Sequence, residues 1–238
     1  MREIVTAVEM KELDRNTIQK AGLSSLVLME RAALKTAEEI MQRLKDRGKE
    51  KILVVCGTGN NGGDGLAIAR LLHLQGIRTW YYVAGKEERM TAETAGQLRT
   101  AEYYQVPRVH NLKPDEYTTI VDAIFGVGLS RPVEGKYAEL ISAMNQTSAY
   151  KVAVDIPSGI DSDTGKEVYV FIRDACMAVR SSLRISEFIP YPERRSACIM
   201  WSKEIWRCFR REFHTEIKEH LERFFLWQAV RECAELHI

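Results

Sequence analysis

The sequence predicts an α/β protein in which helices cover both faces of a mostly parallel sheet, giving three layers. Between residues 51 and 156, short runs of β-branched and aliphatic residues alternate with longer segments of helical periodicity. Such alternation requires crossover connections between parallel strands. Glycines cluster directly after the first of these runs, where a strand-to-helix turn is expected. Two helical segments precede the first strand.

The expected elements follow one another in regular order. Residues 6–9, Thr-Ala-Val-Glu, form a capping box for a first helix that ends at Gly22. Ser25 is expected to cap a long second helix that ends near Gly48. A further helix begins at the glycine cluster and ends at Gly76. The remaining expected elements are strands at 51–56, 79–83, 118–125 and 151–156, and helices at about 91–104 and 136–145.

The glycine-rich turn after the first strand has the features of a phosphate cradle. Residues 57–65 are Gly-Thr-Gly-Asn-Asn-Gly-Gly-Asp-Gly. The free N–H groups and the positive dipole end of a helix N-terminus favour an anion, and glycine lets the backbone approach it. The G-x-G-x-x-G pattern inside the turn is weak evidence alone. No acidic residue ends the next strand, where an ordinary dinucleotide fold holds the ribose, and Glu87 comes too late.

Three expected strands are followed by segments that combine Asp with Gly, at 57–65, 122–132 and 155–161. Ligands of such sheets bind outside the carboxyl ends of the strands. One Asp there can simply cap a turn, but three on neighbouring strands favour a shared site. Carboxylate, amide and hydroxyl oxygens at one rim suit an alkali or alkaline-earth cation better than zinc or copper.

Composition narrows the class of protein. The chain has 238 residues and a formal net charge of +1, which fits one sizeable domain and argues against nucleic acid or an anionic membrane as partner. No apolar run approaches the roughly 18 residues of a spanning helix, and the first residues do not resemble a signal peptide, so a cytoplasmic protein is expected. Five Cys without paired metal spacing suggest reduced thiols rather than disulfides or zinc.

The composition changes sharply after Gly165. All fifteen glycines lie at or before that residue, although an α/β sheet uses glycine at turns and helix ends. We therefore divide the chain into a domain at 1–166 and an atypical tail at 167–238. The tail is either a small helical appendage, with helices within about 203–236, or out-of-frame or diverged sequence. Residues from about 168 onward are expected to pack poorly against the domain.

Four separated motifs resemble those of the NAD(P)H-hydrate epimerases, the YjeF N-terminal domain family. They are Leu-Met-Glu-Arg-Ala-Ala at 28–33, the glycine-rich run at 57–66, Asp-Ala-Ile-Phe-Gly at 122–126 and Asp-Ile-Pro-Ser-Gly at 155–159. The resemblance covers about residues 4–166. It implies a Rossmann-like αβα fold and an isomerase that interconverts the R and S forms of hydrated NADH and NADPH. It also implies a functional partner, an ATP- or ADP-dependent dehydratase that acts on the S form.

The resemblance assigns roles position by position. Asp155 faces the reacting ring as proton donor and acceptor. One potassium ion per subunit is bound by Asn61, Asp122 and Ser158. The hydrated dinucleotide is bound by residues of three loops: Asn60, Asn61, Gly62, Gly63, Asp64, Gly126, Val127, Gly128, Leu129, Ser130, Arg131, Pro132 and Asp155.

Two other classes compete with this interpretation. A non-catalytic nucleotide- or RNA-binding scaffold module has the same fold, but retention of Asp155 and of the three potassium positions argues against it. A conventional NAD-dependent dehydrogenase lacks support because the ribose-binding acid is missing. The sequence leaves open whether the protein is a homodimer and whether it prefers hydrated NADH or NADPH. The atypical C-terminus is expected to reduce stability, and with it activity, more than it alters the site.

Overall fold

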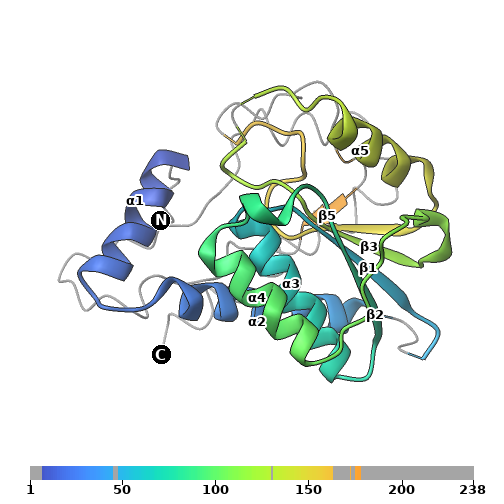
Figure 1. Ribbon diagram of the computed structural model, residues 1–238, viewed down its shortest axis with the longest axis horizontal. Coiled ribbons are helices and arrows are strands. Elements are labelled where there is room, and N and C mark those ends of the chain that lie inside the picture. The colour runs from blue at the N-terminus through green and yellow to red at the C-terminus, as the bar shows by residue number, and fades with distance from the viewer. Residues whose placement is uncertain (1–6, 45–47, 130, 163–171, 173–174, 178–238) are drawn as a thin grey trace, which may run out of the picture. The chain divides into compact units, whose positions relative to one another are not determined.

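The computed structural model describes residues 7–44, 48–129, 131–162, 172 and 175–177. Its centre is a five-stranded sheet in the order β2-β1-β3-β4-β5, and all neighbouring strands are parallel (Figure 1). The strands are β1 (Lys51–Cys56), β2 (Arg78–Val83), β3 (Thr119–Ala123), β4 (Tyr150–Ala153) and β5 (Ala175–Met177). The predicted α/β class with a parallel sheet is confirmed.

Helices cover the two faces of this sheet. The α-helices are α1 (Ala7–Gln19), α2 (Ser25–Arg43), α3 (Asn60–Leu74), α4 (Ala92–Tyr103) and α5 (Lys136–Gln146). Two short 3-10 helices are η1 (Glu87–Arg89) and η2 (Pro114–Glu116). In Figure 1, α2, α3 and α4 lie together on one side of the sheet and α5 lies on the other. Among the described residues, no helix is long and apolar enough to cross a membrane.

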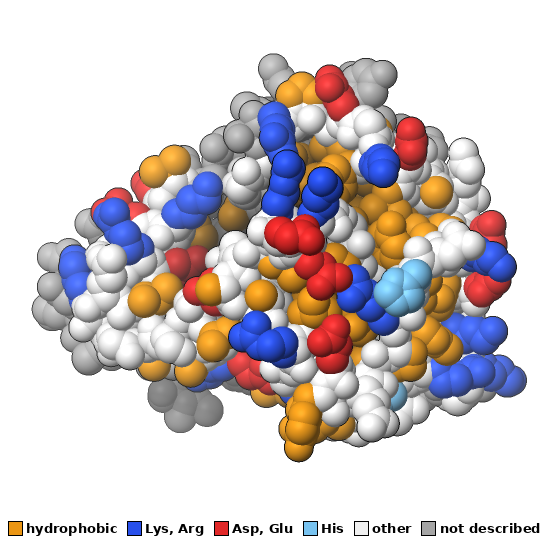
Figure 2. Space-filling model, in the orientation of Figure 1, with side chains coloured by type: hydrophobic (Ala, Val, Ile, Leu, Met, Phe, Trp, Pro, Cys, Tyr) orange, Lys and Arg blue, Asp and Glu red, His pale blue; other side chains and the backbone are white. Residues whose placement is uncertain are grey.

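The side chains of β1 alternate between two hydrophobic clusters, as the period of a strand requires. Ile52 and Val54 lie in a cluster with buried residues of α2, α3 and α4, whereas Leu53 and Val55 lie in a cluster with buried residues of α5. Partly buried hydrophobic residues surround the second cluster. In the view of Figure 2, hydrophobic side chains are exposed over the right half of the molecular surface. The core on both faces holds the strand ends in place.

Most predicted boundaries lie within one or two residues of the observed ones, with informative exceptions. Ser24, not Ser25, caps α2, and its Oγ accepts a hydrogen bond from Val27 N at 3.3 Å. Ser25 Oγ instead donates to Glu93 Oε1 at 2.7 Å, which links α2 to α4. The strands predicted to reach residues 125 and 156 end earlier, at residues 123 and 153. The residues that follow leave the sheet and form loops at its rim.

The sheet extends past Gly165, contrary to the expectation for the tail. β5 pairs in parallel with β4, with Lys151 opposite Ala175. Ile172 is buried, and its N–H donates to Ser158 O at 2.9 Å. The expectation of poor packing from about residue 168 onward is therefore wrong for residues 172 and 175–177. A short strand joins a sheet through hydrogen bonds to its neighbour, and this requires no glycine. Residues 178–238, with the helices predicted within about 203–236, lie outside the described residues.

Candidate functional site

The strand order places a topological switch point between β1 and β3. From β1 the chain crosses to β2 on one side of the sheet, and later enters β3 on the other side of β1. Connections that run in opposite directions leave a crevice at the carboxyl ends of the two strands, and ligands of doubly wound sheets bind there. The glycine-rich turn after β1 and the loop after β3 border this crevice. The segment after β4 lies next to them.

Glycines in the turn are required because two backbone segments touch. Gly57 N donates to Ala123 O at 2.9 Å, and a Cβ on Gly57 would lie 2.1 Å from Ile124 O. A Cβ on Gly62 would lie 1.9 Å from Gly57 O. Neither glycine has a positive φ, so the requirement is space rather than an unusual backbone conformation. The first turn of α3 can therefore sit directly against the end of β1.

Asn61 reaches from α3 to the loop after β3. Its Nδ2 donates to Phe125 O at 2.7 Å, and the residue is 9% exposed. Its Oδ1 is buried and has no hydrogen-bond partner among the described residues. A buried acceptor without a partner costs about 1–3 kcal/mol. This oxygen is therefore suited to receive a cation or a donor group of a ligand.

Asp122 and Ser158 join the same network from β3 and from the segment after β4. Asp122 Oδ1 accepts from Ser158 Oγ at 2.7 Å, and Oδ2 accepts from Ser158 N at 2.8 Å. Ser158 Oγ accepts from Phe125 N at 2.9 Å, so the backbone of Phe125 connects Asn61 to this pair. The three positions predicted to bind potassium thus meet at one place.

The carboxyl group of Asp122 is buried, and burial raises its pKa to about 6. Hydrogen bonds from Ser158 and from Ile124 N oppose this rise, whereas the nearby charge of Asp155 adds to it. The charged form is therefore disfavoured in the folded protein relative to the unfolded chain. A cation beside the carboxylate would reverse that preference, because an opposite charge lowers a carboxyl pKa.

Asp155 lies on the other side of the loop after β3. It is 4% exposed, and its Oδ2 accepts from Val127 N at 3.0 Å. A Cβ on Gly126 would lie 2.4 Å from this oxygen and 3.4 Å from Asn61 Cγ. Only the backbone of Gly126 therefore lies between the side chains of Asp155 and Asn61. The carboxylate predicted for proton transfer and the predicted cation site are immediate neighbours.

The other predicted substrate-binding residues fall into two groups. In α3, Asn60 is exposed, whereas Gly63 and Asp64 are buried, and Gly63 packs against Met29 of α2 and Thr94 of α4. In the loop after β3, the residues with exposed or half-buried positions are Gly126, Val127, Gly128, Leu129, Arg131 and Pro132. Ser130 lies outside the described residues. The crevice is therefore bordered by Asn60 and this loop, while Gly63 and Asp64 lie inside the helix packing.

Sequence reasoning missed the contribution of α4 to the turn. Thr94 is fully buried, and its Oγ1 donates to Gly59 O at 2.9 Å. Thr91 N donates to Thr58 O at 3.1 Å. The N-terminus of α4 therefore holds the backbone of the glycine-rich turn in place. The sequence contains the pattern Thr-x-x-Thr, but it does not indicate that these residues contact a turn more than thirty positions away.

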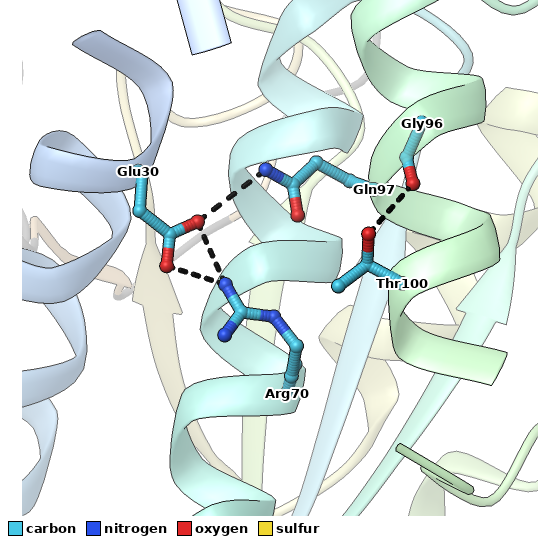
Figure 3. Close-up of polar contacts among 5 residues, drawn as sticks. All are labelled: Glu30, Arg70, Gly96, Gln97 and Thr100. Carbon is cyan, nitrogen blue, oxygen red and sulfur yellow. Dashed lines mark hydrogen bonds and ion pairs between the residues drawn. The ribbon is translucent and has the colours of Figure 1, made fainter. Parts of the chain in front are cut away.

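The motif at 28–33 acts through Glu30, which binds α3 and α4 to α2 (Figure 3). Arg70 Nη2 donates to the two Glu30 carboxylate oxygens at 2.5 and 2.7 Å, and Gln97 Nε2 donates to Oε2 at 3.4 Å. Arg70 is only 8% exposed. Because α3 begins at the glycine-rich turn, this contact among three helices fixes the position of α3 and therefore of the turn.

Glu30→Leu is expected to lower the free energy of unfolding by about 2–4 kcal/mol, because it leaves the buried guanidinium of Arg70 without its carboxylate. Chemical denaturation measures the loss. The matched control is Glu38→Leu on the same helix, whose carboxylate lies 3.9 Å from Lys35 in an exposed pair. That variant should change stability by no more than about 0.5 kcal/mol. Equal losses in the two variants would refute a special role for Glu30.

Comparisons with known proteins find one matching family, similar sequences and a similar solved structure. The model of a family described as YjeF-related protein N-terminus matches residues 25–184. A protein of Limosilactobacillus reuteri (strain DSM 20016) named NAD(P)H-hydrate epimerase is 46% identical over 172 residues, which cover 72% of this chain and 81% of the relative. A protein of the same name from Levilactobacillus brevis is 45% identical over 166 residues, 69% of this chain and 76% of that relative.

Among solved structures, the crystal structure of the yeast protein YNL200c has a TM-score of 0.67 and 28% sequence identity, over 74% of this chain and 79% of that chain. The family match also continues beyond residue 166, where we placed the end of the domain, and takes in β5. The similarity therefore extends over the sheet and the loops that border the crevice.

Proposed function

We propose that this chain, which belongs to the family of YjeF-related protein N-termini, is an NAD(P)H-hydrate epimerase. It is an isomerase that interconverts the R and S forms of hydrated NADH and NADPH. One observation carries the proposal. The loop after β3 brings the buried Asp155 carboxylate next to Asn61, at the switch point where a dinucleotide is expected to bind.

The reaction needs one positioned proton-transfer group. Carbon C6 of the hydrated ring carries a hydroxyl and is bonded to the ring nitrogen. The nitrogen lone pair expels this hydroxyl as an acid protonates it, and water adds to the opposite face as a base removes its proton. Asp155 performs both steps, first donating its proton and then accepting one from the incoming water. The hydrogen bond from Val127 N holds the carboxylate in one orientation.

The phosphates of the substrate bind at the N-terminus of α3. The free N–H groups of a helix start favour phosphate, and the exposed Asn60 stands in that first turn. The exposed Arg131 of the loop after β3 supplies a charged donor. The nicotinamide ring then extends toward Asp155.

The cation site fits potassium. The donors are oxygens only, and the buried Asn61 Oδ1 has no hydrogen-bond partner among the described residues. Asn61, Asp122 and Ser158 would hold one ion per subunit. Such an ion would neutralise the Asp122 carboxylate and place positive charge beside the bound dinucleotide.

Potassium is expected to raise the melting temperature when it replaces tetramethylammonium at constant ionic strength. An ion that binds only the folded state stabilises it by about 2.7 kcal/mol at a hundred times its dissociation constant. In Asn61→Ala the difference between the two salts should disappear, because the acceptor without a partner is gone. Identical melting curves of the unmodified protein in the two salts would mean that no potassium binds here.

Epimerisation itself can be tested with hydrated NADPH enriched in the R form. The protein should bring the two epimers to equilibrium faster than they interconvert without enzyme, as followed by chromatography. Addition of an ATP- or ADP-dependent dehydratase that acts on the S form should then consume all of the substrate at that faster rate. Exchange no faster than the uncatalysed background would contradict the proposed activity.

A further inference from the structure

The rim of the sheet provides a continuous surface from the end of β4 to the end of β2. The strands β4, β3, β1 and β2 are consecutive neighbours. Strands lie about 4.8 Å apart, so the distance from β4 to β2 is about 14 Å. If the proposed function holds, the reacting ring lies at β4 and the phosphates at β1 and β3. The adenosine half of the substrate then points toward the loop that follows β2.

This loop is built against the glycine-rich turn. Ala84 N donates to Cys56 O at 2.7 Å. Gly85 has a φ of +112°, and a Cβ there would lie 2.5 Å from Tyr137 Oη and 3.1 Å from Thr58 Cγ2. The Tyr137 hydroxyl donates to Ala84 O at 3.2 Å. The loop therefore starts in direct contact with the proposed phosphate site.

Tyr137 also connects this loop to the one after β3. Its ring centroid lies 5.0 Å from that of Phe125, the residue whose backbone joins Asn61 to Ser158. One wall thus extends from the loop after β2, across the turn after β1, to the loop beside Asp155. A dinucleotide bound along this wall contacts all three segments.

Beyond Gly85 the surface has an open hollow of about 740 Å³, lined by residues 85–89. Glu87 Oε1 accepts a hydrogen bond from the guanidinium of Arg108, which offsets part of the Glu87 charge. Lys86 and Arg89 form no ion pair within the described part of the chain, and Glu88 is the remaining acid of the loop.

The hollow offers two basic side chains, Lys86 and Arg89, and two acidic ones, of which Glu87 is paired with Arg108 and Glu88 is the other. The charge of such a loop can discriminate between riboses. A ribose hydroxyl is recognised best by an acidic side chain, whereas a 2′-phosphate needs basic ones. We propose that the loop 85–89 binds the adenosine ribose and that Lys86 and Arg89 make the protein prefer hydrated NADPH to hydrated NADH. Glu88 opposes this preference through its like charge with the phosphate.

The first test is of binding and does not depend on turnover. NADPH and NADH differ only in the 2′-phosphate, and titration of their fluorescence gives both dissociation constants. NADPH should bind at least tenfold tighter, and the ratio should shrink as salt screens the charges. Equal affinity for the two dinucleotides would overturn the proposal. Tighter binding of NADPH by a protein that shows no epimerase activity would support the loop assignment and refute only the proposed function.

The second test uses variants and the ratio of kcat/KM for the two hydrates. The double variant Lys86→Gln, Arg89→Gln should lose about 10- to 100-fold with hydrated NADPH and less than threefold with hydrated NADH. Glu88→Gln should shift the ratio the opposite way. The control Arg99→Gln removes an exposed charge of α4 outside this hollow and should leave the ratio unchanged. An equal loss with both hydrates in the double variant would overturn the assignment.

Discussion

Asp155→Asn is expected to slow interconversion of the two epimers by about 10²-fold or more while dinucleotide affinity stays within about threefold of the unmodified protein. The amide keeps the shape of the carboxylate and can still accept the hydrogen bond from Val127 N. It cannot donate a proton to the departing hydroxyl or take one from water. The loss should therefore fall on kcat, with little change in KM.

Epimer exchange followed by chromatography measures this effect, and titration with NADPH measures the affinity. Asp115→Asn is a suitable control because it removes one exposed carboxylate from η2, away from the strand ends of the site. It should leave both quantities nearly unchanged. Undiminished exchange by Asp155→Asn would remove this residue from the mechanism. A large loss of affinity would instead make it a binding residue.

Gly62→Ala is expected to reduce the free energy of unfolding by about 2–4 kcal/mol, the cost of inserting a methyl group where no space exists. The new Cβ would lie 1.9 Å from Gly57 O, and a backbone oxygen cannot move aside as a flexible side chain can. Either α3 shifts away from β1 or the turn opens. Both movements separate Asn61 from Phe125, so epimerase activity should fall together with stability.

Gly59→Ala is the matched control in the same turn. Gly59 has a φ of −86°, and a Cβ there would have no atom within 4 Å. Because Gly59 caps α3, its replacement by alanine should lower the free energy of unfolding by no more than about 1 kcal/mol, as measured by chemical denaturation. If Gly62→Ala unfolds at the same denaturant concentration as Gly59→Ala, the contact between α3 and the turn does not limit the fold.

Local patterns in the sequence were enough to predict the α/β class, the order of its elements and the strand ends that bear the site. Residues 52–56 are all buried, and their unbroken run of hydrophobic side chains indicates a strand covered on both faces. The prediction that Asp122, Asp155 and the glycine-rich turn meet at one rim followed from a general rule for parallel sheets. The network through Phe125 agrees with it.

The partners of each segment were decided only by the tertiary structure. No motif predicts the contacts made by the backbone of Phe125, the hydroxyl of Thr94 and the ring of Tyr137, yet these contacts join the loops of the site. Their contacts span tens of residues along the chain, and periodicity describes only neighbours in sequence.

The tail shows that a prediction from local composition can also fail. Absence of glycine after Gly165 suggested that the sheet had ended, but β5 adds to β4 and Ile172 is buried in the cluster that includes residues of α5. The amino-acid composition of a segment indicates only which turns its backbone can form. Whether a three-residue strand joins a sheet depends on the free edge of its neighbour and on the apolar surface that it covers, and only the folded chain brings these together.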